Sequence, residues 1–350
     1  MSSIIFILVL GIIFTAILIW GFRTLPGERW QILATIPFMK GADGHWRGLN
    51  LTYYGLITAT AYIISVALLY VLLGSIHIPF LLIFSLVCFT LMVCVPASSL
   101  IARIVEKKRH TFSVAAAFFT GVLVIPFIIW GLNQTIGQSL NHQIAFIPAL
   151  AAISVIYAVG EGLGRLACIS FGCCYGKSLS DCQPTVQKIF DRWAFTFLGN
   201  TKKIAYASNM EGIKVLPIQG LTAMLYVATA LAGTYLFLNQ MFLATFVMTM
   251  LVTQLWRLYS ETLRADYRGQ GKVSAYQLMA IISTVYAVAI GFFISDVPHP
   301  VPDLFAGLDL LWQPAMIIFL QLIWLTIFVY TGRSAVTESS VAISVCRDKI

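Results

Sequence analysis

The chain has 350 residues, of which 59% are hydrophobic and 10% are charged, and its formal net charge at pH 7 is +8. Its mean hydropathy is +0.88. This composition excludes a soluble protein built on one or two cores and predicts an all-α integral membrane protein with many spans. The bilayer is the expected surroundings, and no nucleic-acid partner is expected.

Nine apolar stretches are each long enough to cross a bilayer, which takes about 20 helical residues. In chain order they are Ile4–Trp20, Leu51–Leu73, Ile78–Ile101, Phe112–Trp130, Ile144–Gly162, Ile218–Leu238, Phe242–Leu258, Ala275–Ile294 and Trp312–Tyr330. No clear small-residue cleavage site follows the first stretch, which is therefore expected to be an uncleaved anchor rather than a signal peptide.

The basic residues fall on one side of these nine spans. All 22 Lys and Arg lie in residues 21–50, 103–111, 165–216, 257–273 and 331–350. The loops on the other side contain none; they are residues 74–77, 132–143, 239–241 and 295–311. The positive-inside tendency therefore predicts that the basic side faces the cytoplasm and that Met1 faces out.

The most informative segment follows the fifth apolar stretch and reads GLGRLACISFGCCYG over residues 162–176. It places Arg165 at the expected end of a membrane helix, and a charged residue at membrane depth is by default functional. Glycines such as Gly164 and Gly172 let a backbone approach a ligand closely or adopt positive φ. The segment therefore predicts a polar pocket built into a wall of lipid-embedded helices.

This segment resembles the signature G-R-x-x-N/C-F-x-x-G-E/C-x-Y-G of the prolipoprotein diacylglyceryl transferases, in a cysteine-rich form. Three further pieces resemble blocks of that family and occur in the same order. They are Tyr53-Tyr54-Gly55-Leu56, Pro217-Ile218-Gln219, and the E-x-x-R-x-D-x-R-G run from Glu261 to Gly269 with Ser274 and Gln277 after it.

The resemblance covers roughly Leu49 to Phe293 and implies a division of the chain into three parts. Residues 1–48 form an extra N-terminal helix and a polar linker. Residues 49–294 form a seven-helix membrane core, from which residues 177–216 extend as an arm outside the membrane. Residues 295–350 add a C-terminal helix and a tail, which is expected to be poorly ordered.

The resemblance also implies an activity: a multi-pass enzyme of the bacterial plasma membrane that moves the diacylglyceryl group of phosphatidylglycerol to a cysteine thiol of a prolipoprotein. A thioether forms and glycerol phosphate leaves. Arg165 and Arg264 suit the phosphate of such an anionic phospholipid, because a guanidinium presents a planar fork and stays charged. Glu261, three residues before Arg264, is expected to orient it or to take a proton.

Further residues in the matching blocks are expected to bind the substrate. On a continuing helix, Arg268 would share a face with Arg264. The alternative is that Arg257, Arg264 and Arg268 merely extend to lipid headgroups. The remaining residues expected to line the site are Tyr54, Gly164, Cys168, Gly172, Cys173, Gly176 and Gln219.

One position departs from the family pattern. Ala115 stands where the family has a His or Tyr that is thought to help the nucleophile. His110 is the nearest candidate catalytic substitute, although the adjacent Lys107, Lys108 and Arg109 favour its neutral form. The alternatives are that His110 is an ordinary surface residue, that a glutamate acts as the base, or that the acceptor is not a prolipoprotein thiol.

The clustered cysteines Cys168, Cys173, Cys174 and Cys182 do not have a known zinc spacing, and no nearby histidine completes one. No metal site and no cofactor is therefore expected. Cys168 and Cys173 are interpreted as small pocket-lining residues. A disulfide between Cys174 and Cys182 requires that this side of the membrane be oxidising.

Three questions stay open on the sequence. The first is the side of the membrane: the resemblance implies a pocket on the outer face, whereas the charge pattern places the same motifs on the cytoplasmic face. Three explanations would resolve this conflict. A span is miscounted, the basic loops contact anionic lipid, or the chain is a related protein whose pocket faces the cytosol. The arm is either a cap over the pocket or a plain surface loop. A transporter and a non-catalytic lipid-binding protein are the alternative functions.

Overall fold

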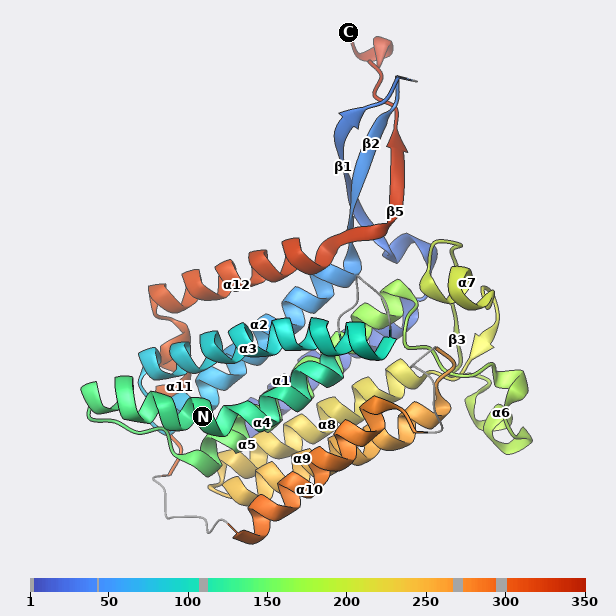
Figure 1. Ribbon diagram of the computed structural model, residues 1–350. Helices are drawn as coiled ribbons and strands as arrows, with labels where there is room; N and C mark the ends of the chain where they lie inside the picture. Colours follow the sequence, from blue (N-terminus) through green and yellow to red (C-terminus); the bar gives the residue numbers. More distant parts are fainter. Residues whose placement is uncertain (1–2, 43, 107–112, 267–272, 294–300) are drawn as a thin grey trace.

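The computed structural model describes residues 3–42, 44–106, 113–266, 273–293 and 301–350. Within these residues the chain is mostly helical, and nine helices are long and apolar enough to cross a membrane. The prediction of a multi-pass membrane protein with nine spans is thereby confirmed. Figure 1 shows these helices running roughly side by side, with the strands and the arm gathered at one end of the bundle.

The spanning helices begin and end close to the predicted apolar stretches. They are α1 (Ser3–Thr24), α2 (Tyr53–Ser75), α3 (Phe80–Glu106), α4 (Val114–Leu132), α5 (Phe146–Phe171), α8 (Ile218–Leu238), α9 (Phe242–Ser260), α10 (Ala275–Phe293) and α12 (Pro314–Gly332). The short helix α11 (Leu304–Leu311) precedes α12, and a π-helical turn (Asn133–Gly137) extends α4.

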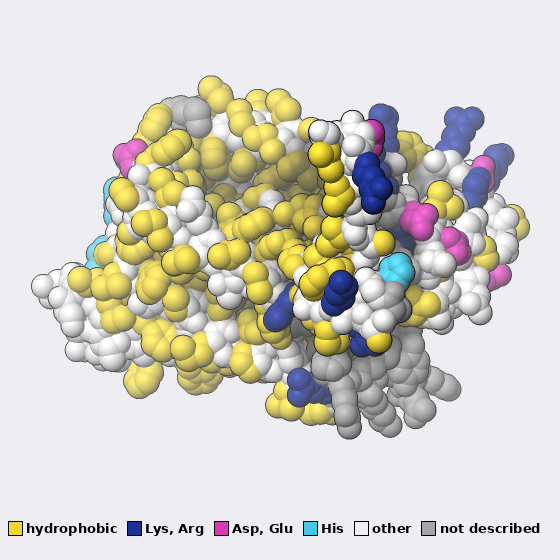
Figure 2. Space-filling view, turned by 90° about the horizontal axis from the view of Figure 1, so that it is seen from above, with side chains coloured by type: hydrophobic (Ala, Val, Ile, Leu, Met, Phe, Trp, Pro, Cys, Tyr) yellow, Lys and Arg dark blue, Asp and Glu magenta, His cyan; other side chains and the backbone are white. Residues whose placement is uncertain are grey.

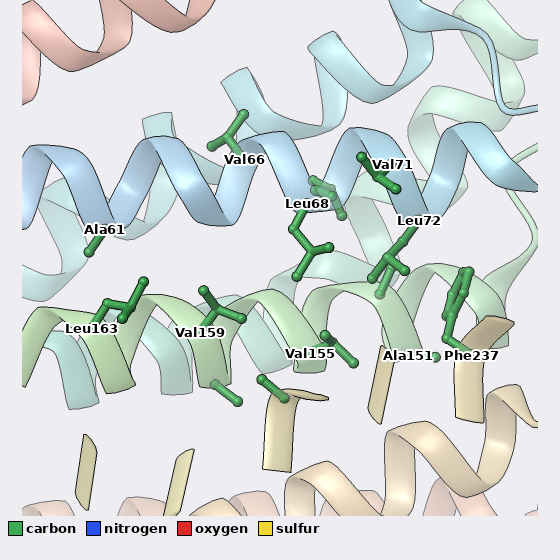
Figure 3. Close-up of a cluster of buried hydrophobic side chains, with 14 of the residues drawn as sticks. Ala61, Val66, Leu68, Val71, Leu72, Ala151, Val155, Val159, Leu163 and Phe237 are labelled. Atoms are coloured by element: carbon green, nitrogen blue, oxygen red, sulfur yellow. The ribbon is translucent and has the colours of Figure 1, made fainter. Parts of the chain in front are cut away.

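The centre of the bundle is α5, which packs against α2 and α8. Figure 3 shows this contact: Leu68 and Leu72 of α2 face Val155 and Val159 of α5, with Phe237 of α8 alongside. Leu72 and Val155 are fully buried. Between membrane helices such packing provides van der Waals attraction where the hydrophobic effect contributes little.

Small residues set how closely these helices approach. A Cβ atom added to Gly160 would lie 2.7 Å from the hydroxyl of Ser65, and one added to Gly162 would lie 3.2 Å from the Cβ of Tyr226. Glycines at these two positions therefore allow α2 and α8 to pack tightly against the part of α5 that carries Glu161 and Arg165. Bulky side chains there would push the helices apart.

The end of α5 differs from the expectation. The helix does not end near Gly162 but continues to Phe171, so Arg165 lies inside it. It ends at Gly172, which caps the helix in the left-handed conformation with φ 71° and donates its N–H to the carbonyl of Ile169. Glycine adopts this conformation without strain, whereas Gly160 and Gly162 pack against neighbouring helices in ordinary helical geometry.

The end of α9 also differs. The helix ends at Ser260 and is followed by a 3₁₀ turn, Glu261–Leu263, and then by Arg264 in an extended conformation. The idea that Arg264 and Arg268 share one face of a continuing helix is therefore wrong, because the helix has already ended. Arg268 itself lies outside the described residues.

The predicted linker and tail are ordered as strands. β1 (Ile32–Lys40) and β2 (Trp46–Thr52) form a hairpin, and β5 (Arg333–Val341) pairs antiparallel with β2, giving the order β1-β2-β5. The expectation of a poorly ordered tail is wrong for β5, because β2 offers it an unpaired edge with backbone groups to satisfy. This narrow sheet projects from the end of the bundle and carries the C-terminus at its tip (Figure 1).

The arm, residues 177–216, contains two short helices and a two-stranded sheet. These are α6 (Pro184–Phe190), β3 (Phe195–Thr196), α7 (Lys203–Ser208) and β4 (Lys214–Val215), with a 3₁₀ turn, Leu179–Asp181, before them. The arm packs on the turn that follows α5: the Tyr175 hydroxyl is 2.5 Å from that of Ser208.

Lys202 fastens the arm to the helices. Its side chain is fully buried, and its Nζ donates hydrogen bonds to the carbonyls of Leu25, at 3.1 Å, and Ser170, at 2.6 Å. Burial lowers the pKa of Lys202 to about 8. This amine therefore ties the ends of α1 and α5 to the arm, an arrangement that its position in a basic loop did not indicate.

Replacing Lys202 with methionine is expected to loosen the arm. The two carbonyls lose their donor, and a buried unsatisfied acceptor costs about 1–3 kcal/mol. Limited proteolysis should therefore cut the arm of the variant faster, and urea unfolding should occur earlier, than in a Lys188→Met control at an exposed position of α6. Equal proteolysis of the two variants would show that Lys202 does not hold the arm.

The one-sided charge pattern is visible on the molecular surface. Figure 2 shows Lys and Arg gathered at the end that carries the sheet and the arm, while hydrophobic side chains cover most of the other part of this face. The spans predict that this basic end faces the cytoplasm.

Labelling of introduced cysteines from outside intact cells should test this orientation. With the exposed Cys346 first changed to serine, and with labelling counted above that of this parent protein, Ala207→Cys in the arm is expected to add no label and Met241→Cys, in the opposite loop, to react. Both positions are exposed, unlike Lys202, which is unsuitable for a probe. If Ala207→Cys is labelled and Met241→Cys is not, the arm faces the outside and the predicted orientation is wrong.

Candidate functional site

Backbone pairing brings the two arginine motifs together. After α5, the turn 173–177 runs antiparallel to residues 263–265, which follow α9. The N–H of Ala265 donates to the carbonyl of Tyr175, and the N–H of Lys177 donates to the carbonyl of Leu263, both at 3.1 Å. Two segments about ninety positions apart in the sequence therefore form one wall at the basic end of the bundle.

A buried ion cluster lies on α5 next to this wall. Oε1 of Glu161 accepts a short hydrogen bond from Arg165, one helical turn further on, and lies 3.2 Å from the guanidinium of Arg257 on α9. The side chains of Glu161 and Arg257 are 4% and 7% exposed, and that of Arg165 is 14% exposed. One carboxylate thus faces two guanidinium groups, and the cluster carries a net charge of +1.

A second ion cluster surrounds Arg264. Its Nε and one terminal nitrogen donate to the two carboxylate oxygens of Asp266, each at 2.8 Å, and its other terminal nitrogen donates to Glu261 at 3.2 Å. All three side chains are buried. Glu261 and Arg264, three residues apart, form a buried ion pair. The bidentate fork of Arg264, however, is already occupied by Asp266.

Several polar atoms at the first cluster have no hydrogen-bond partner among the described residues. They are Oε2 of Glu161, Nε of Arg165 and Nε of Arg257, all of them buried. Oε1 of Gln219, at the start of α8, is also buried and has no partner among the described residues. A buried polar atom without a partner is uncommon and costs free energy. Their concentration around Glu161 and Arg165 is what a site for a polar ligand would show.

Aromatic side chains connect this cluster to α4 and α8. Arg257 donates to the hydroxyl of Tyr157 at 2.7 Å, and the ring of Tyr157 stacks on Phe118 of α4 with 3.7 Å between centroids. Ala115 lies one turn before Phe118 and is buried. The position where the resembling family has His or Tyr is therefore on the face of α4 that approaches the ion cluster.

The predicted substrate-binding residues lie around the same wall. Gln219 is fully buried at the start of α8 and donates to the carbonyl of Cys173 at 2.9 Å. Gly176 has no room for a side chain, since an added Cβ would lie 2.5 Å from the carbonyl oxygen of Leu216. Around Gly164, by contrast, a Cβ would meet nothing within 4 Å, so α5 has open space at the position before Arg165.

Tyr54 completes this side of the site. It lies in the first turn of α2, where Thr52 caps the helix by accepting from the N–H of Gly55, and its ring contacts that of Phe171 at 5.7 Å. It is within electrostatic range of Cys168, Cys173 and Cys174. Motif blocks that are far apart in the sequence thus lie close together in space.

The cysteines do not pair as a disulfide. Cys174 and Cys182 are both reduced thiols, and Cys182 instead donates to the carbonyl of Ser178. Cys168, Cys173 and Cys174 come together, with all three Sγ atoms within 4.8 Å of one another.

Two predicted site residues, the candidate base His110 and Arg268, lie outside the described part of the chain. Two other residues, Arg257 and Tyr157, belong to the ion cluster but are not among the predicted site residues. The sequence names Arg257 only in the alternative that it extends to lipid headgroups, and that alternative is wrong for Arg257, which is buried and paired with Glu161. Tyr157, its other partner, was not singled out. Helical spacing predicts the Glu161–Arg165 pair, but no local signal links Arg257 to residues nearly one hundred positions earlier.

A scan of the chain against protein-family models gives no match, and a search of curated proteins gives no match either.

Proposed function

We propose that this protein is a membrane transferase that moves the diacylglyceryl group of an anionic phospholipid, phosphatidylglycerol, to a thiol acceptor. The observation that carries this proposal is the Glu161–Arg165–Arg257 cluster, a buried group with a net positive charge on membrane helices. A membrane protein retains such a costly arrangement mainly for function. The short motifs that resemble the diacylglyceryl transferases surround the same cluster.

Arg165 is the group best placed to bind the phosphate. Its side chain is the most exposed of the three in its cluster, its Nε has no partner among the described residues, and the helix has open space at the preceding residue, Gly164. Arg264, by contrast, has its fork filled by Asp266. Arg264 is therefore assigned to fixing the conformation of its own segment, through Glu261 and Asp266, rather than to binding the lipid.

Glu161 and Arg257 position Arg165. The carboxylate of Glu161 fixes one side of the Arg165 guanidinium, and Arg257 fixes Glu161 from the opposite helix. A preorganised cation stabilises negative charge that develops on a leaving phosphate without having to reorganise during the reaction. In the transfer, the acceptor thiol loses its proton to solvent and its sulfur forms a bond to the glyceryl carbon, while the carbon–oxygen bond to phosphate breaks and glycerol phosphate leaves with the electron pair.

The acceptor is tested most simply in bacteria that lack their own prolipoprotein diacylglyceryl transferase. If the acceptor is a prolipoprotein thiol, expression of this protein restores lipid modification of prolipoproteins, and Arg165→Ala abolishes it. If only Ala115→His restores modification, the native acceptor is of another kind. If neither the wild type nor Ala115→His restores modification, although each is present in the membrane, the acceptor is not a prolipoprotein thiol.

A further inference from the structure

Three thiols meet at the end of α5. Cys168 lies on the last turns of the helix, and Cys173 and Cys174 follow the Gly172 cap; their three Sγ atoms are all within 4.8 Å of one another. Among the described residues this is the one group of three or more His, Cys, Asp or Glu side chains whose donor atoms lie close enough to share a metal ion. Spacing in the sequence did not indicate such a group.

The backbone is shaped to bring these thiols together. Gly172 turns the chain in the left-handed conformation, and Cys174 adopts φ 58°, which is uncommon for a residue with a side chain. The N–H of Cys173 donates to the carbonyl of Cys168 at 3.0 Å, and Gln219 donates to the carbonyl of Cys173. The turn is thereby fixed to α5 and α8 before any ligand arrives, and an unusual conformation held in this way is typical of functional sites.

One guanidinium that is not fully neutralised lies near the cluster. Arg165 is within electrostatic range of Cys168 and Cys174, whereas Arg264 is already paired with Asp266 and Glu261. A nearby positive charge favours the thiolate, which is the form of cysteine that binds metals. Cys168 and Cys174 are partly exposed while Cys173 is buried, so the cluster opens on the side of Cys168 and Cys174.

We propose that Cys168, Cys173 and Cys174 bind one Zn²⁺ ion as three thiolates, with the fourth tetrahedral position open. With Zn–S bonds of about 2.3 Å, the sulfurs of such a site lie roughly 3.8 Å apart, which small side-chain rotations achieve from the separations present here. The three thiols release three protons, and water fills the fourth position, so the site carries a net charge of −1. The net charge of +1 on the Glu161–Arg165–Arg257 cluster offsets that charge, because Arg165 is within electrostatic range of Cys168 and Cys174.

A catalytic role for this site rests on the proposed function. The zinc ion would generate the acceptor thiolate, a task for which Ala115 provides no basic side chain. The acceptor thiol replaces the water on Zn²⁺ and loses its proton to solvent, because a thiol that coordinates this ion is deprotonated. Its sulfur then attacks the glyceryl carbon, glycerol phosphate leaves, and the neutral thioether is displaced from the metal by water. Three protein ligands with a fourth position for water or substrate is the arrangement of catalytic zinc sites.

The site is tested by titrating the full-length, detergent-solubilised protein, reduced and stripped of metal, with Zn²⁺ against a chromophoric chelator. We expect one Zn²⁺ per chain, with release of protons, and an affinity that falls by more than ~10-fold in Cys168→Ser and Cys173→Ser. Cys182→Ser, outside the cluster, should bind as the wild type does. Titration with Cd²⁺ should give the ultraviolet thiolate-to-metal band in the wild type and a weaker one in the two cluster variants.

Thermal unfolding separates loss of the site from loss of the fold. Without metal, Cys168→Ser should unfold at about the wild-type temperature, and Zn²⁺ should raise the unfolding temperature of the wild type and of Cys182→Ser but not that of Cys168→Ser. Absence of stoichiometric binding to the wild type, or equal binding to Cys168→Ser, would overturn the metal site. Zinc binding with no lipid transfer would contradict the proposed function and leave the site standing. Transfer at the wild-type rate by Cys168→Ser would overturn the role of the metal in activating the acceptor.

Discussion

Replacing Arg165 with lysine is expected to slow lipid transfer by roughly 10- to 100-fold. Lysine keeps the positive charge but lacks the planar fork, and the missing charge-assisted hydrogen bonds are worth about 1.5–3 kcal/mol in the transition state. The Nε of Arg165 is buried and has no partner among the described residues. We therefore attribute the slower transfer to missing hydrogen bonds to the phosphate. The rate is measured with labelled phosphatidylglycerol in detergent or vesicles.

Arg103→Lys provides the matched control. Arg103 is an exposed residue in the last turn of α3, on the same side of the membrane as Arg165, and its substitution should leave the rate unchanged. Wild-type turnover by Arg165→Lys would show that Arg165 is a structural or surface residue and not a phosphate ligand.

Replacing Glu161 with glutamine is expected to destabilise the protein by about 3–5 kcal/mol, because it leaves two buried guanidinium groups without a counter-charge. Glu161 is the carboxylate shared by Arg165 and Arg257, and its side chain is 4% exposed. Glutamine has the same size and keeps one acceptor oxygen, so the decrease in the free energy of unfolding measures the effect of removing the negative charge. The change is measured by urea or thermal unfolding in detergent.

The Asp191–Lys214 pair of the arm is the control for this prediction. Its atoms are 2.6 Å apart, closer than Glu161 and Arg257, but its side chains are 61% and 52% exposed. Exposed pairs contribute only about 0–1 kcal/mol, so Asp191→Asn should leave stability nearly unchanged. If Glu161→Gln and Asp191→Asn lower the free energy of unfolding by similar amounts, burial does not make the Glu161 ion pairs more important for stability than the exposed pair.

The membrane helices are predictable from the sequence because lipid imposes one strong condition: an apolar run long enough to cross it. The run from Ile218 to Leu238 is the helix α8. Helix ends are harder to predict where polar residues continue a helix, as α5 does through Glu161 and Arg165. There, neighbouring helices and an ion pair satisfy the charges, so hydropathy falls without the helix ending.

Pairs close in the sequence are likewise predictable, and distant ones are not. Glu161 and Arg165 meet because residues four apart share a helix face. The contact of Glu161 with Arg257, the pairing of β5 with β2, and the buried position of Lys202 all depend on tertiary packing of distant segments. A lone Lys or Arg in a basic loop carries no local signal that it will be buried.

The cysteines illustrate the same limit. Cys168 and Cys173 are separated by the Gly172 cap, and only the left-handed turn there places their thiols side by side. A search for known ligand spacings misses such a group, because the geometry is set by a helix end and not by a compact metal-binding loop.

The central claim is that this protein breaks the bond between diacylglycerol and phosphate in phosphatidylglycerol. It is tested most directly by incubating the purified protein with phosphatidylglycerol labelled separately in its headgroup and its diacylglyceryl part, together with thiol-bearing acceptor peptides. We predict equal amounts of released glycerol phosphate and peptide thioether, and almost none of either with Arg165→Ala. Labelled phosphatidylglycerol that remains intact, or that moves between vesicles without cleavage, would contradict the claim and identify a lipid-binding or lipid-transporting protein instead.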